Sequence, residues 1–250
     1  MSEGKPAAPI APWRRALRDQ RALVMVDLVV VALVFVADWR HHIYFSKTPY
    51  LLALGWLSLR ARGLDWRRVG VAPPPSWPRV VGLGLAAGVA MEALELFVTQ
   101  PLLVWWTGKY PDLSVFAQSR HNVQLLLLLV AGSWTLAAFG EELVWRGYVL
   151  NRVSDLFGRA RAATFAALVL TSAAFGLVHA DQGVTGVIEI GIDGALLGIL
   201  YLLSGRNLWL PIIAHGVTDT LDSAPHARWP LADLTTPRRP TATETTSRTE

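Results

Sequence analysis

Long blocks of apolar residues, separated by short polar segments, are the feature of this sequence that most limits its fold. The first block, Ala22–Ala37, is interrupted only by Asp27. A helix of about 20 such residues crosses the hydrocarbon core of a bilayer. The other blocks are Ile43–Leu59, Val80–Val104, Val123–Phe139 with an extension towards Leu150, Ala162–His179, Val184–Leu203 and Leu208–Leu221. We therefore predict an all-α fold, a polytopic transmembrane helix bundle of about seven spans, within a range of six to eight because the second and last blocks are short.

The composition supports a membrane protein. Hydrophobic side chains make up 52% of the chain and charged ones only 17%, whereas soluble domains carry about 25% charged residues. The absence of cysteine excludes a disulfide scaffold and any Cys-ligated metal site. The net charge of +4 comes from basic residues between apolar blocks, so membrane topology explains it better than a nucleic-acid partner, and none is expected.

The loops carry an asymmetric distribution of Lys and Arg. When they are assigned alternately to two sides, beginning with the N-terminal segment, one side holds 14 of these residues and the other 4. This is the positive-inside pattern, and it predicts a multi-pass protein of the cell (inner) membrane with a cytoplasmic N-terminus. The expected organisation is a cytoplasmic segment at 1–21, a membrane-embedded helical domain at 22–221 and a disordered polar tail at 222–250.

Ionisable side chains inside the apolar blocks raise the free energy of membrane insertion, so each is expected to have a structural or functional role. In the sequence EELVWR at 141–146, Glu142 and Arg146 are four residues apart, share a helix face and can form an ion pair. Glu141 is rotated away from that face and lacks this partner. A desolvated carboxylate beside a second acid suits a general base, although a pair at a helix end that reaches the interface is the alternative.

Two histidines occupy later blocks. His179 ends the sequence FGLVH, and a lone histidine at the end of a span is more often structural. His215 shares a helix face with Asp219 in HGVTD, which indicates either a positioned imidazole or half of a metal site. Taken together, the carboxylates, imidazoles and arginine on three helices fit activation of water against a carbonyl group.

Other acids in the blocks have a less specific interpretation. Asp27, Glu92 with Glu95, and Glu189 with Asp193 are expected to pair with Arg or His of the bundle, or to line a wet cavity. The glycines at 82, 84 and 88 include the small-residue spacing of close helix packing.

These motifs resemble those of the CPBP family of intramembrane endopeptidases, which includes type II CAAX prenyl proteases and bacteriocin-processing and immunity proteins. The family motifs EExxxR, FxxxH and HxxxN/D correspond to EELVWR, FGLVH and HGVTD, in the same order. The stretch from Gly194 to Asp219 is similar to bacterial members, and the likeness covers roughly residues 123–221. The resemblance implies an all-helical protease in which Glu141 and His179 activate water, His215 and residue 219 stabilise the oxyanion, and Glu142 and Arg146 support the site.

The chain departs from the prenyl-protease pattern at Asp219, where that pattern has Asn. An ionised Asp cannot donate to an oxyanion, so it is either protonated or serves to orient and charge His215. Relatives have often been labelled metalloproteases, but no HExxH pair is present. A site without a cofactor is therefore favoured, with Zn²⁺ at Glu141, His179 and His215 as the alternative.

The predicted function is endoproteolysis of a membrane-anchored or lipidated peptide or protein substrate within the lipid bilayer. A non-catalytic immunity factor or scaffold is the second hypothesis, and a transporter is the third. One geometric difficulty accompanies the first: a simple serpentine places Glu141 and His215 about nine residues from one membrane face, roughly 14 Å, and His179 nearer the other face.

Overall fold

The computed structural model describes residues 20–113, 122–158 and 160–223, and in these ranges the chain is helical and contains no strand. The described residues form seven continuous helical stretches, one for each apolar block. The first two are α2 (Arg21–Trp39) and α3 (Thr48–Ala61), and the short 3-10 helix η1 (Trp66–Val69) follows. The third stretch consists of α4 (Trp77–Leu94), η2 (Glu95–Thr99) and α5 (Gln100–Thr107).

The second half of the chain supplies the other four stretches. The longest consists of α6 (Val123–Gly132), η4 (Ser133–Glu141), η5 (Leu143–Val149) and α7 (Leu150–Leu156). It is followed by α8 (Arg161–Leu177), by the 3-10 turn η6 (Ala180–Gln182) leading into α9 (Gly183–Leu203), and by α10 (Trp209–Asp222). The prediction of an all-α bundle is confirmed.

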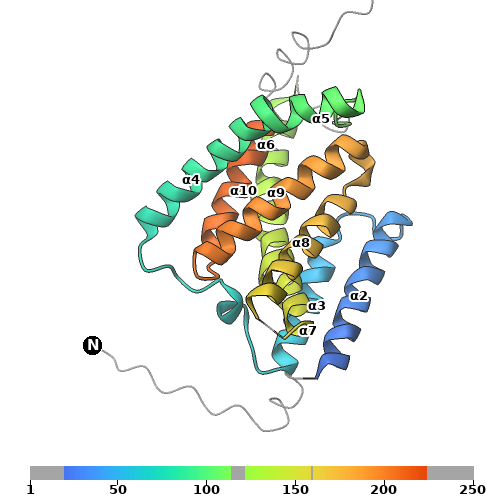
Figure 1. The fold of residues 1–250 in the computed structure, drawn as a ribbon, viewed down its shortest axis with the longest axis vertical. Coiled ribbons are helices and arrows are strands. Elements are labelled where there is room, and N and C mark those ends of the chain that lie inside the picture. The colour runs from blue at the N-terminus through green and yellow to red at the C-terminus, as the bar shows by residue number, and fades with distance from the viewer. Residues whose placement is uncertain (1–19, 114–121, 159, 224–250) are drawn as a thin grey trace, which may run out of the picture.

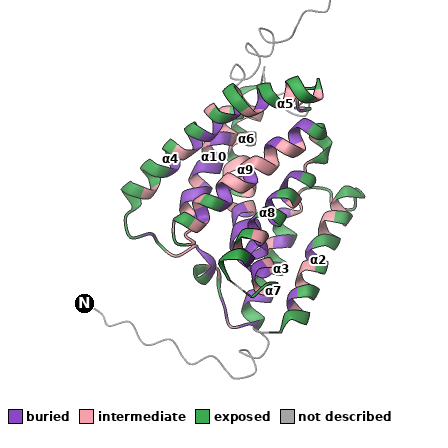
Figure 2. Cartoon of the chain, in the orientation of Figure 1, coloured by how far each residue is buried: buried purple, intermediate pink, exposed green. Residues whose placement is uncertain are grey.

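Four of the described helices are long and apolar enough to cross a membrane. They span Arg21–Trp39, Trp77–Thr107, Val123–Leu156 and Ala180–Leu203, and Arg161–Leu177 is a shorter apolar helix. Large apolar side chains such as Leu33, Leu128 and Phe165 stand exposed on the outside of these helices, and Figure 2 shows the outer faces of α2 and α4 largely exposed. Such a surface suits contact with lipid.

Glycines set the packing of α4, which together with α5 runs along one side of the bundle, opposite α2 (Figure 1). A Cβ atom at Gly84 would lie 2.7 Å from Ile213, and one at Gly88 would lie 2.6 Å from the carbonyl oxygen of Ala214. These two glycines therefore allow α10 to approach α4, as the small-residue spacing predicts. Gly82 faces open space and takes no part in this contact.

Hydrogen bonds group the loops on two sides of the bundle. On one side, the Leu208 amide donates to the carbonyl of Gly70 (2.9 Å) and the Asn207 side chain donates to the carbonyl of Ala72 (3.0 Å). On the other, the Asp112 amide donates to the carbonyl of Gln182 (3.0 Å). The loops that hydrogen-bond to one another are those that a chain crossing the bundle back and forth would bring to the same side.

The intramembrane acid Asp27 pairs with an arginine, as predicted. Arg62 on the C-terminal side of α3 lies 2.7 Å from its carboxylate, and the Ser58 hydroxyl donates to the same oxygen at 2.9 Å. This network ties α2 to α3. The predicted N-terminal segment and polar tail lie almost wholly outside the described residues.

Candidate active site

Glu142 is the central acid of the site and is fully buried. It lies in the longest helical stretch between the two π-helical segments η4 and η5, and π-helical turns occur frequently at functional sites. Its Oε1 atom accepts hydrogen bonds from Arg146 Nη1 (2.5 Å) and from His215 Nδ1 (2.9 Å). The predicted ion pair of Glu142 and Arg146 is therefore present, and it also holds the histidine of the third motif.

Arg146 is bound on two further sides. Its Nη2 donates to the carbonyl of Gly194 in α9 at 2.9 Å, and its guanidinium carbon lies 4.7 Å from the centre of the Phe175 ring. A Cβ atom at Gly194 would meet that ring at 3.1 Å. The small residue therefore lets the arginine, the ring and the α9 backbone come together.

His215 projects from α10 and faces an acid with each ring nitrogen. Because Nδ1 donates to Glu142, Nε2 is left facing Asp219 Oδ1 at 3.5 Å. That separation is longer than an ordinary N–H···O hydrogen bond, so the contact is electrostatic. The i, i+4 spacing thus brings His215 and Asp219 together as predicted.

His179 follows the last turn of α8 and has a defined tautomer. Its Nδ1 lies 2.8 Å from the carbonyl oxygen of Phe175, and since a carbonyl only accepts, Nδ1 carries the proton. In the neutral imidazole, Nε2 is then the acceptor nitrogen. The hydrogen bond holds the ring against the last turn of α8, next to Phe175.

Phe175 connects all three motifs. Its ring makes edge contacts with His179 (5.1 Å between centroids) and His215 (6.4 Å), and it also packs on Trp145 (5.4 Å) and under Arg146. The sequence analysis gave this residue no role. The available signal was its place as the first residue of the FxxxH motif.

Glu141 lies beside this network, half-buried at the end of η4. It receives no hydrogen bond or ion pair from the described residues, although its charge acts on Arg146, His215 and Asp219. The carboxylate is therefore near the other site residues and available to a further molecule.

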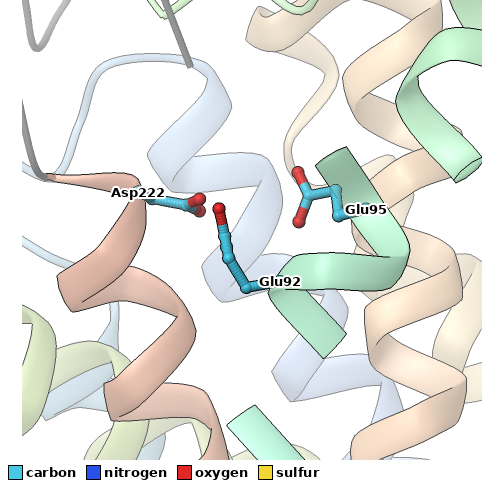
Figure 3. A group of neighbouring side chains, drawn as sticks. All are labelled: Glu92, Glu95 and Asp222. Carbon is cyan, nitrogen blue, oxygen red and sulfur yellow. The ribbon is translucent and has the colours of Figure 1, made fainter. Parts of the chain in front are cut away.

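A separate acidic cluster lies towards the end of α10. Carboxylate oxygens of Glu92, Glu95 and Asp222 come within 4.8 Å of one another, and in Figure 3 Asp222 and Glu92 point towards each other. Asp222 was not predicted to join the Glu92–Glu95 pair. Within the described ranges, Glu141, His179 and His215 do not form a group of this closeness; Zn²⁺ at those three residues stays a prediction.

The fold and site define a helical membrane protein with an ionic cluster inside its bundle. Residues 123–221 match a family model described as type II CAAX prenyl endopeptidase Rce1-like. The resemblance to this family is therefore confirmed over residues 123–221, the range that the motifs predicted. No curated protein and no solved structure matches the chain. The match points to a membrane protease.

Proposed function

We propose that the chain is an intramembrane endopeptidase that hydrolyses a peptide bond of a membrane-anchored or lipidated protein by water activated by Glu141 and His179. One observation carries the proposal: the Phe175 ring contacts Arg146, His179 and His215, so the three motifs meet at one place in the bundle. An unbonded carboxylate, Glu141, lies next to that place.

The reaction begins with removal of a proton from water. Glu141 accepts it, with Nε2 of His179 as a second acceptor, and the hydroxide attacks the carbonyl carbon of the scissile bond. The tetrahedral intermediate carries an oxyanion, which a protonated His215 stabilises by donating from Nε2. The proton then passes to the leaving amine as the C–N bond breaks, which yields a carboxylic acid and an amine.

The buried ion pair positions this apparatus. Glu142 binds Nδ1 of His215 and so directs Nε2 away from Arg146, towards Asp219. Arg146 neutralises Glu142 and anchors it to α9 through Gly194. Glu142 and Arg146 therefore support the site, whereas Asp219 orients His215 through its contact with Nε2.

The proposal includes the position of the protein in the membrane. We expect it in the cell membrane with its N-terminus in the cytoplasm, because loops rich in Lys and Arg face inward and one side holds 14 of these residues. The bilayer and a membrane-associated substrate are its partners, and no cofactor is needed for the steps above.

The test compares membrane peptides in cells expressing the wild type or the variant Glu141→Ala. A protease leaves fragments that appear with the wild type and not with the variant, at equal amounts of folded protein. Identical peptide sets, with a cellular phenotype that survives the substitution, would favour a non-catalytic immunity factor or scaffold. Flux of protons or ions in proteoliposomes would favour a transporter.

A further inference from the structure

A cavity of about 420 Å³ lies where the segments at 64–69, 151–152 and 201–206 meet. None of the proposed active-site residues lines it. Its polar walls are formed by Arg68, Asn151, Arg152, Tyr201 and Arg206, and no acidic residue belongs to the lining. The cavity is therefore distinct from the Glu142–His215 site, and its lining carries basic but no acidic side chains.

Three arginines from three separate segments line this cavity. Arg68 is exposed on η1, Arg152 is almost completely buried in α7, and Arg206 is half-buried in the turn between α9 and α10. Arg152 forms an ion pair with Asp155 at 2.8 Å, which offsets one of the three charges. The remaining positive charge favours an anion in the cavity.

Buried polar groups hold the wall in place. The Asn151 side chain donates to the hydroxyl of Tyr201 (3.0 Å) and accepts a hydrogen bond from Arg206, while Tyr201 donates to the carbonyl of Val69 (2.9 Å). The backbone of Arg206 is also unusual. Its φ angle of +64° is rare for a residue other than glycine. Such strain persists where the surroundings impose it, often at ligand sites.

The location indicates the source of the anion. The cavity lies on the side of the bundle with the larger share of Lys and Arg, the side assigned to the cytoplasm. Guanidinium groups bind phosphate oxygens through paired hydrogen bonds, and basic pockets between transmembrane helices on this side bind anionic lipid headgroups. We propose that the cavity between η1, α7 and the α9–α10 turn binds the phosphate of an anionic lipid headgroup.

The experiment uses the full-length protein in detergent micelles, titrated with phosphatidylglycerol, phosphatidylcholine or inorganic phosphate. Bound lipid is counted by native mass spectrometry, and the unfolding temperature is recorded in parallel. We expect phosphatidylglycerol to bind and to raise the unfolding temperature, with no such effect from phosphatidylcholine. Arg68→Gln and Arg206→Gln should each weaken binding by about tenfold, as loss of a charge-assisted hydrogen bond does.

Arg67→Gln is the matched control, because Arg67 is the exposed neighbour of Arg68 on η1 and does not line the cavity. It should leave the affinity within about twofold of the wild type, since Arg67 does not line the cavity and its charge is screened by solvent there. Equal binding of the two lipids, or unchanged affinity in both cavity variants, would overturn the proposal. Binding of inorganic phosphate without phosphatidylglycerol would overturn the assignment to lipid. Arg68 is exposed, so its variant is informative even where Arg206→Gln disturbs folding.

Discussion

The guanidinium carbon of Arg146 lies 4.7 Å from the centre of the Phe175 ring. This contact joins the first motif to the second, and the same ring touches the histidines of the second and third. A cation over an aromatic face is stabilised further when it is desolvated, and both residues are buried. The ring therefore packs against the arginine and both histidines and helps to fix where each of them lies.

Glu141→Gln should reduce peptide cleavage by at least about 100-fold, because a general base supplies 10²–10⁴-fold. The unfolding temperature should stay close to that of the wild type, since Glu141 makes no hydrogen bond or ion pair with the described residues. Initial rates on a substrate identified in cells measure the effect. Glu95→Gln, a change at another buried acid, is the control and should keep the activity. Normal cleavage by Glu141→Gln would exclude the proposed base.

Glu142→Leu should lower the free energy of unfolding by about 3–5 kcal/mol, because it leaves Arg146 as a buried charge without its carboxylate. The double variant Glu142→Leu/Arg146→Met should recover most of that loss and remain inactive, since His215 is no longer held. Unfolding in mixed micelles with increasing denaturing detergent measures both. A double variant as unstable as the single one would show that the ion pair does not account for the loss.

Asp219→Asn should keep activity, whereas Asp219→Ala should lose it. An amide can still contact Nε2 of His215, which lies 3.5 Å from the carboxylate, but a methyl group cannot. Cleavage rates of the two variants, measured at equal amounts of folded protein, make the comparison. Loss of activity in both would mean that the carboxylate itself is required.

Phe175→Leu should lower kcat by about fivefold with an unchanged KM, because loss of the ring's contacts removes about 1 kcal/mol of positioning. Phe165→Leu is the matched control on the same helix, where the ring is 67% exposed, and it should have no effect. A parallel rise in KM would point to substrate binding instead of positioning of the histidines.

Gly176→Ala should lower the free energy of unfolding by about 1–3 kcal/mol through overpacking. A Cβ atom there would lie 2.2 Å from the carbonyl oxygen of Val187, so α8 and α9 would have to separate. Gly82→Ala is the control, since its Cβ would meet nothing within 4 Å, and it should be neutral or slightly stabilising. Equal stability of the two variants would contradict this view of the α8–α9 contact.

Much of the fold could be predicted from the sequence, because apolar blocks report directly on helices in a membrane. Each predicted block corresponds to one described helical stretch, and a clear shift occurs at α3, which begins at Thr48 instead of Ile43. Pro49 explains the shift, since proline favours the first turn of a helix. The i, i+4 pairs could also be predicted, because their geometry is local.

Contacts between distant segments could not be predicted in this way. The carbonyl of Gly194 has no signature in the sequence, yet it binds Arg146 from a helix 48 residues away. Asp222 joins Glu92 and Glu95 only because glycines let α10 approach α4. The hydrogen bond of His179 to its own helix also could not be predicted, since it depends on the rotamer of the ring.

The turn that follows α8 limits how a target could be presented. Asp181, only two residues beyond His179, is exposed, and irregular polar backbone is tolerated at membrane depth only against protein or water. The histidine therefore lies next to polar backbone that needs protein or water around it. A protein cut there would not have to unwind its anchor down to the bilayer midplane, and juxtamembrane stretches are where its cleavage sites should be sought.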